Sequence, residues 1–275
     1  MLTDVTVPLL RRTALLPGES LPSLVERLAQ LNHYSGTAVL NLLCQAQQAP
    51  PLNQDEPACP RFGATFLRLA HLTQLPAAEL WAASAHRFTP TLTPAGEAPT
   101  EPPWLDAPTR PRALPTLTHL HLRPAHTAQY CPVCLQGTPY HQLNWMPVAA
   151  TLCLEHLCLL VDRCPSCQQP VTIADIVRRR CRACRTDLRL TTAVLVTGDD
   201  LGLLAQHMIQ SWFAVAPAPV LDATRQLPPQ SPALLYRLLA YLSRRLLSYR
   251  AIWPTWPTPL PSLAEHATSL SSRSY

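Results

Sequence analysis

The residues best suited to chemistry are four closely spaced pairs of cysteine or histidine in the middle of the chain. In each pair two residues separate the ligands, so both side chains can reach the same metal ion. One such pair is a weak signal, but four within 54 residues indicate metal binding. The pairs are Cys131 with Cys134, Cys153 with His156, Cys164 with Cys167, and Cys181 with Cys184.

The pattern predicts two closed zinc sites, because thiolate and imidazole ligands in sets of four suit Zn2+. We group the pairs in chain order, so that the first two hold one ion and the last two hold the other. An iron–sulfur cluster stays open as an alternative at the site with four cysteines. Since four protein ligands leave no position for water or substrate, we expect structural ions and no catalytic residues.

Four other side chains resemble ligands but fit the sites less well. His141 could compete with His156, although it stands alone in a predicted loop. Cys158 would be a fifth ligand of the first site, and we expect it to pack as a small buried residue instead. Cys44 and Cys59 lie far from the pairs in sequence and are expected to be ordinary thiols.

Arginines crowd around the last cysteine pair. A rigid, metal-held turn that displays guanidinium groups could contact a phosphate backbone. A solvated charged surface, or a docking patch for an acidic partner, would give the same pattern. The candidate residues for nucleic-acid or partner contact are Arg178, Arg179, Arg180, Arg182 and Arg185.

The composition excludes several classes of enzyme. The 275 residues include 22 arginines and no lysine, so a lysine-containing phosphate-binding loop and a lysine Schiff base are both impossible. The formal net charge of +5 permits nucleic-acid contact without marking a strongly basic protein. Hydrophobic residues make up 47% of the chain, which argues against disorder throughout.

The sequence contains no recognisable signal peptide and no apolar stretch of the ~20 residues that a membrane span needs. We therefore expect a cytoplasmic protein. Cysteines stay reduced in that compartment, which favours metal ligation over disulfides.

The chain around the cysteines predicts a mainly α-helical fold with small zinc-ribbon β elements. Apolar residues at helical spacing predict a helix that begins after Asp199 in the C-terminal part of the chain. They also predict N-terminal helices that begin after Ser20, after Gly36 and at Phe62, and one that spans residues 77–85. The last two helices are joined by residues 73–76. They form either a helix-turn-helix-like unit or a plain helical hairpin.

Proline, with 31 residues, divides the chain because it excludes helix where it is dense. The expected organisation is an N-terminal helix-turn-helix-like domain at 1–89, a proline-rich linker at 90–125, a tandem zinc-binding module at 126–195, a C-terminal helical region at 196–252 and a flexible tail at 253–275.

Two parts of the chain resemble the TniQ/TnsD family of transposition target-selection proteins. The family opens with a segment and helix similar to residues 15–21 (LLPGESL), 27–29 (RLA) and Asn32. Its cysteine region has the order found in residues 130–134 (YCPVC), Trp145, 153–156 (CLEH) and 159–167 (LLVDRCPSC).

The resemblance implies a non-catalytic adaptor from a bacterium or a mobile element. Relatives link a target recogniser to an AAA+ ATPase that forms filaments on DNA and recruits the transposase. The recogniser is an RNA-guided CRISPR effector complex, or the TniQ-type protein itself bound to DNA. Some relatives dimerise, so a homodimer is compatible with the resemblance.

Two other functions compete with the adaptor. A zinc-ribbon transcription regulator would bind a specific duplex without partners. A RING-type ubiquitin ligase has the same ligand order, but its first and third pairs share one ion. Its histidine is closely followed by the next cysteine, whereas seven residues separate His156 from Cys164 here.

Overall fold

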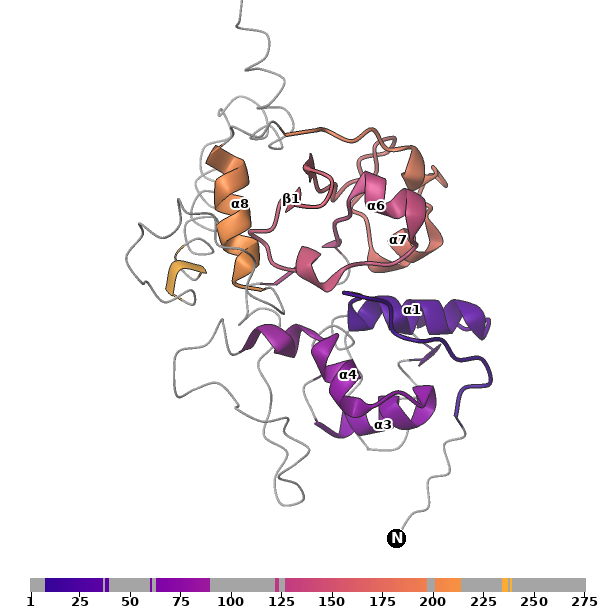
Figure 1. The fold of residues 1–275 in the computed structure, drawn as a ribbon. Coiled ribbons are helices and arrows are strands. Elements are labelled where there is room, and N and C mark those ends of the chain that lie inside the picture. Colours follow the sequence, from indigo (N-terminus) through magenta and orange to yellow (C-terminus); the bar gives the residue numbers. More distant parts are fainter. Residues whose placement is uncertain are drawn as a thin grey trace, which may run out of the picture.

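The computed structural model describes residues 8–36, 38–39, 60, 63–89, 122–123, 127–196, 201–213, 234–236 and 238. This part of the chain is mainly helical with a small two-stranded sheet, as the sequence predicts. Helices α1, α3 and α4 form one side of the molecule, and the cysteine-rich module with α8 forms the other (Figure 1). Most of the predicted linker and all of the predicted tail lie outside the described residues.

The N-terminal helices pack around one apolar core. α1 spans Leu21–Leu31, α3 spans Gly63–Thr73 and α4 spans Ala77–Ala82. α1 begins with Pro22 in its first turn, where proline removes no helical hydrogen bond. The core contains Leu21, Leu24 and Leu28 from α1, Phe66, Leu69 and Leu72 from α3, and Leu80 from α4, all nearly inaccessible to solvent.

The end of α4 differs from the prediction of a helix over residues 77–85. After Ala82 the chain turns, and a short 3-10 helix, η1 (Ala85–Phe88), follows. The Ser84 side chain accepts a hydrogen bond from the backbone N–H of His86 and so caps the new helix. Serine favours such a cap over the interior of a helix, which is why the chain breaks there.

The cysteine-rich module contains little regular structure. Strands β1 (Leu152–Cys153) and β2 (Cys158–Leu159) pair antiparallel, with Cys153 opposite Cys158. The remaining elements are α6 (Pro132–Gly137), η3 (Leu143–Trp145), α7 (Ile173–Arg178) and η4 (Leu188–Leu190). Its core combines apolar side chains such as Tyr130 and Ile176 with the cysteine sulfurs.

The carboxylate of Asp175 joins two parts of this module. Thr172 and Asp175 form a capping box at the start of α7, in which each side chain binds the other residue's backbone N–H. The second oxygen of Asp175 accepts a hydrogen bond of 2.8 Å from the backbone N–H of Arg182. The buried carboxylate thereby links the helix to the turn between Cys181 and Cys184.

Two glutamines of helix α8 (Leu201–Ser211) hydrogen-bond the backbone of the module. Gln206 accepts from the Thr151 N–H and donates to the Ala149 carbonyl, while Gln210 donates to the Leu152 carbonyl. A third apolar core connects these parts and contains Ala85, Phe88, Leu122, Leu143, Met146, Ile209, Phe213 and Tyr236. Within the described residues, no helix is both long and apolar enough to cross a bilayer.

The start of α1 joins the helical unit to the cysteine-rich module. The Ser20 hydroxyl hydrogen-bonds His141 Nδ1 at 2.9 Å, and the Ser20 N–H donates to the His141 carbonyl at 2.9 Å. The His141 N–H in turn donates to the Ser23 hydroxyl at 3.0 Å. Leu143 N–H donates to the carbonyl of Gly18, whose φ of 70° lies in the left-handed region that favours glycine.

Buried polar groups at this junction are satisfied by one another. Glu19 accepts from the Leu16 N–H, the Ser23 hydroxyl and the Arg27 guanidinium. Burial lowers the pKa of His141 to about 3, so its ring is neutral at physiological pH. The ring also meets Trp145 edge-on, with 5.7 Å between the ring centroids.

Replacing Ser20 with alanine removes the hydroxyl that hydrogen-bonds the buried Nδ1 of His141. An unsatisfied buried polar group costs about 1–3 kcal/mol, so we expect the free energy of unfolding to fall by about that amount. Urea denaturation of metal-loaded protein measures it. Thr192→Ala removes a hydroxyl from an exposed residue and is the control, with an expected change within about 0.5 kcal/mol. Equal losses in both variants would contradict the proposed importance of this contact.

Candidate metal centres

The first cluster draws its ligands from α6 and from the β1–β2 hairpin. Cys131 immediately precedes α6, Cys134 lies in its first turn, Cys153 ends β1, and His156 lies in the hairpin turn. Cys131 is the N-cap of α6, and its sulfur accepts the backbone N–H of Cys134 at 3.4 Å. Pro132 begins the helix, which places the two sulfurs on the same side of its first turn.

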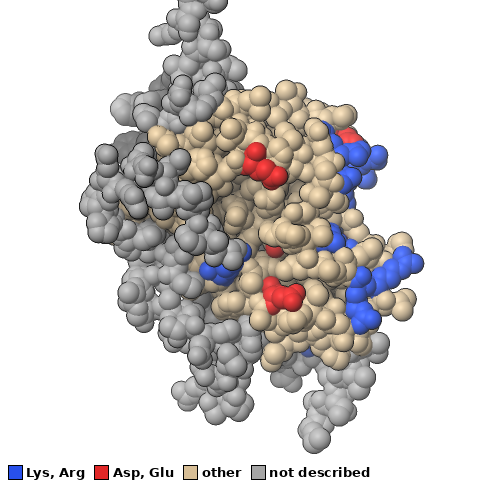
Figure 2. Space-filling model, viewed as in Figure 1, with Lys and Arg blue, Asp and Glu red and all other residues tan. Residues whose placement is uncertain are grey.

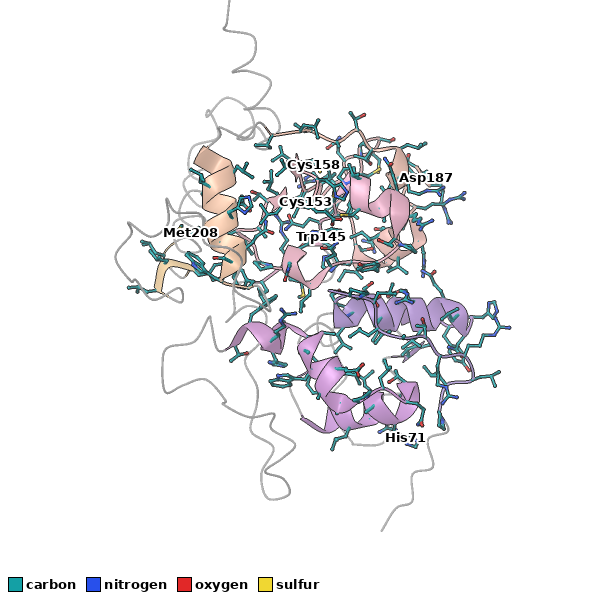
Figure 3. The ribbon with its side chains drawn as sticks, viewed as in Figure 1. His71, Trp145, Cys153, Cys158, Asp187 and Met208 are labelled. Carbon is teal, nitrogen blue, oxygen red and sulfur yellow. The ribbon has the colours of Figure 1, made fainter. Side chains whose placement is uncertain are left out.

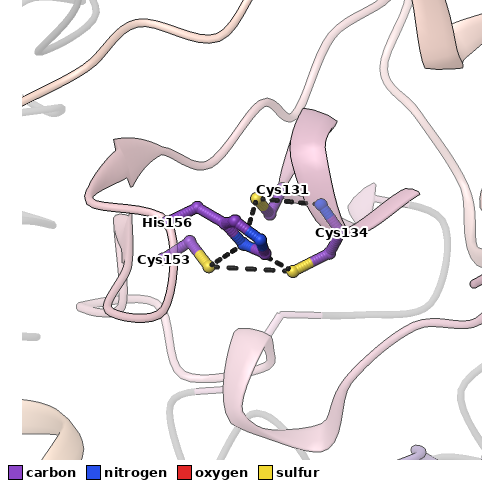
Figure 4. A group of neighbouring side chains, drawn as sticks. All are labelled: Cys131, Cys134, Cys153 and His156. Carbon is purple, nitrogen blue, oxygen red and sulfur yellow. Dashed lines mark hydrogen bonds between the residues drawn. The ribbon is translucent and has the colours of Figure 1, made fainter. Parts of the chain in front are cut away.

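The ligand atoms of the first cluster surround one point (Figure 4). His156 Nδ1 lies 3.6 Å from Cys131 Sγ, 3.2 Å from Cys134 Sγ and 3.6 Å from Cys153 Sγ. The sulfurs of Cys134 and Cys153 are 3.8 Å apart. Sulfur ligands at ~2.3 Å from a tetrahedral ion would be about 3.8 Å from one another, and a nitrogen ligand would lie slightly closer to them. The four side chains therefore fit a single tetrahedral ion.

The second cluster consists of Cys164, Cys167, Cys181 and Cys184. The sulfurs of Cys164 and Cys184 are 3.5 Å apart, and those of Cys167 and Cys181 are 3.6 Å apart. Both distances again match an edge of a tetrahedral site. Cys184 is exposed and Cys164 is buried, so the cluster lies at the surface of the module.

The two turns of the second cluster have the same backbone geometry. Gln168 N–H donates to the Cys164 carbonyl at 3.0 Å, and Arg185 N–H donates to the Cys181 carbonyl at 2.9 Å. Gln168 and Arg185 both adopt left-handed φ, at 57° and 65°. Leu157, the fourth residue after Cys153, has φ of 48° and repeats this feature in the first cluster. In three of the four ligand pairs, the residue directly after the second ligand is thus a non-glycine residue in a strained, left-handed conformation.

The clusters have the sequential grouping expected from the sequence. The atoms within each group lie within 4.8 Å of one another, and each group contains two consecutive pairs. The cross-braced arrangement of RING-type ligases requires the first and third pairs to meet, which they do not. This geometry argues against that alternative.

Of the four other candidate ligands, His141 and Cys158 lie outside both groups, and Cys44 and Cys59 lie outside the described residues. His141 hydrogen-bonds Ser20 and does not compete with His156. Cys158 is fully buried, with its sulfur 3.4 Å from that of Cys131. Sequence reasoning missed that His141 belongs to the junction with α1. The only available signal was the pair of polar residues, Glu19 and Ser20, directly before an apolar helix.

The candidate contact arginines divide into two kinds. Arg179 is partly buried, and its guanidinium donates to the Gly137 carbonyl at 3.4 Å. Arg178, Arg180, Arg182 and Arg185 are exposed. Figure 2 shows basic side chains gathered along one edge of the molecule, at the side where Figure 1 places α6, α7 and the end of α1.

Arg178 also acts within the molecule. Burial raises the pKa of Glu26 on α1, and the positive charge of Arg178 opposes this rise. This electrostatic contact accompanies the packing of α1 against α7. Arg182 and Arg185, in contrast, form no ion pair with any described residue, which makes them the best placed of the set to meet a partner.

A comparison with protein families matches the TniQ family model to residues 10–160. The match spans more than half of the chain. The chain belongs to the TniQ family. The matched TniQ region contains the junction at Ser20 and His141 and the complete first cluster, whereas the second cluster follows it in sequence. No curated protein matches the sequence.

Pairs of substitutions test the sequential grouping. We expect Cys131→Ala combined with Cys153→Ala to remove one ion, because both residues belong to the first cluster. Cys131→Ala combined with Cys164→Ala should remove both ions, because these residues belong to different clusters. Mass spectrometry of the purified protein measures its metal content. Cys44→Ala is the control, because Cys44 belongs to none of the four ligand pairs. Loss of both ions from the first double variant, with loss of only one from the second, would contradict the grouping.

Proposed function

We propose that this TniQ-family protein is a non-catalytic, zinc-binding adaptor in transposition. It links a target recogniser, either an RNA-guided CRISPR effector complex or DNA itself, to an AAA+ transposition ATPase. TniQ membership places the chain in transposition target selection. The observation that carries the adaptor proposal is that both candidate metal centres offer four protein ligands, the arrangement of a structural ion.

Zinc is the ion that best suits these ligands. One cluster offers three thiolates and one imidazole, and the other offers four thiolates. Zn2+ accepts both sets in tetrahedral geometry and has no redox chemistry of its own. When bound, it would hold the surrounding turns in place. Cys131, Cys134, Cys153 and His156 would hold the first ion, and Cys164, Cys167, Cys181 and Cys184 the second.

The buried polar residues of the matched region also support a structural role. Glu19, Ser20, Ser23 and His141 satisfy one another at the junction, which leaves none of them available as a general acid or base. A neutral His141 with no solvent access suits a contact between two units better than proton transfer. These residues hold the helical unit against the metal module in a defined orientation.

Two parts held together by a hydrogen-bonded junction, with an exposed basic edge, suit a protein that contacts several partners at once. We propose that Arg178, Arg180, Arg182 and Arg185 form the contact surface, with Arg179 positioning it through Gly137. Guanidinium groups bind phosphate or carboxylate groups through paired hydrogen bonds. Either nucleic acid or an acidic protein surface would be a suitable partner.

One observation favours a second candidate, a zinc-ribbon transcription regulator. The paired turns of the second cluster, with arginines around them, could contact DNA without any protein partner. Such a regulator would bind one specific duplex, whereas an adaptor needs its partners for a defined target.

Capture experiments test the adaptor. Metal-loaded protein should retain its proposed AAA+ transposition ATPase partner when DNA is present, with or without the RNA-guided complex. The Cys131→Ala and Cys153→Ala double variant is the control and should lose this capture, because the matched region depends on the first cluster. Folded protein with both ions that captures neither partner, yet binds one duplex tightly, would support the regulator instead.

The arginine surface is tested by Arg182→Ala with Arg185→Ala. If the surface contacts phosphates, binding of nucleic acid should weaken uniformly across sequences. Each lost contact should also reduce the slope of log affinity against log salt by about 1. Fluorescence anisotropy at several salt concentrations measures this, with exposed Arg12→Ala as the control. If nucleic-acid binding is unchanged and ATPase capture falls, the surface docks an acidic protein. If neither changes, the arginines are only solvated.

A further inference from the structure

Cys158 is a fifth sulfur beside the first metal centre. It lies on β2 directly opposite Cys153 on β1, in the same small hairpin (Figure 3). Its side chain is fully buried, and its sulfur lies 3.4 Å from the sulfur of Cys131. The residue is therefore in contact with one of the candidate ligands of the first centre.

Cys158 does not complete the ligand set. The four atoms that converge on one point are those of Cys131, Cys134, Cys153 and His156, and the sulfur of Cys158 is not among them. Its contact with Cys131 is the one sulfur contact it makes among the described cysteines. The fifth sulfur thus contacts one member of the ligand set without belonging to that set.

The chemistry of the pair fixes the direction of the contact. A metal-bound cysteine is a thiolate and has no proton to donate. Cys158, which is outside the ligand set, keeps its S–H. The only hydrogen bond that the pair can form in the loaded protein runs from the Cys158 thiol to the Cys131 thiolate.

The hydrogen-bond donors around Cys131 differ from those around Cys134. Cys131 already accepts the Cys134 N–H at 3.4 Å, so Cys158 gives it a second close donor. Cys134 is partly exposed, lies 3.8 Å from a carboxylate oxygen of Glu155 and accepts only a long contact of 3.8 Å from Gln142. Hydrogen-bond donors therefore stabilise the negative charge of the buried Cys131 thiolate, whereas the partly exposed Cys134 thiolate receives little such stabilisation.

We propose that Cys158 is a positioning residue that donates an S–H hydrogen bond to the Cys131 thiolate and thereby helps the first centre retain its ion. The inference rests on the metal binding proposed above. Groups that hydrogen-bond a metal ligand from outside the site commonly affect metal affinity by about 10–100-fold when removed. Because S–H is a weak donor, we expect the lower end of this range.

Cys158→Ser and Cys158→Val separate hydrogen bonding from packing in the full chain. Serine keeps a donor but is polar and smaller. Valine fills the apolar space and has no donor. If Cys158 acts as a donor, the valine variant should release its first ion to a chelator about tenfold faster than the serine variant. If Cys158 only packs, serine should be the worse replacement, because it places a hydroxyl in an apolar core.

The cobalt-substituted protein gives a second readout. Loss of a donor leaves the Cys131 thiolate richer in charge, so its sulfur-to-cobalt absorption band should move to lower energy in the valine variant and stay near the wild-type position in the serine variant. Difference spectra against wild type isolate the first centre. Valine that matches wild type in band position and release rate would overturn the proposal. A variant that loses the first ion on purification counts as the faster one.

Metal content separates this proposal from the proposed function. Wild-type protein that carries no ions would remove the basis of both. Wild-type protein with two ions, together with a serine variant that behaves worse than the valine variant, would reject the role of Cys158 and leave the adaptor proposal intact.

Discussion

The convergence of eight ligand side chains is the constraint on which the cysteine-rich module depends. Its strands are two residues long and its helices six, too short to be stable alone. The chain also holds Leu157, Gln168 and Arg185 in left-handed conformations that oppose folding. A bound ion at each cluster would supply the stabilisation that the short elements lack. The repeated turn geometry then follows from the need to present two ligands to one point.

The first cluster is connected to the helical unit through a short chain of contacts. Gln142 donates to the Cys134 sulfur and pairs as an isolated bridge with Glu19. The neighbouring His141 binds Ser20 and Ser23 at the start of α1. A continuous series of contacts therefore joins the first cluster to the start of α1. The region that matches the family, residues 10–160, contains both ends of this connection. Its helical part and its first cluster thus belong to one structural unit.

The sequence predicted the features that depend on local pattern. The helical class, the positions of α1, α3 and α8, and the four ligand pairs follow from periodicity and spacing. It did not reveal the junction, because Ser20 and His141 are 121 residues apart and each resembles a residue with a local role. Ser20 looks like a helix cap, yet its hydroxyl binds His141 and caps nothing. Cys158 was expected to be a packing residue. Its contact with Cys131 depends on the pairing of two strands that are too short to be predicted from a sequence pattern.

The arginines near the second cluster surround a centre that would itself be strongly anionic. Four thiolates and one divalent ion carry a net formal charge of about −2. Part of the positive charge on this edge would therefore be balanced within the molecule. Beyond the screening length of about 8 Å in physiological salt, an approaching polyanion would sense a much weaker field than the number of arginines indicates. Attraction at this edge would be short-ranged. A partner would therefore be selected by the complementarity of the two surfaces in contact, and not by long-range electrostatic attraction.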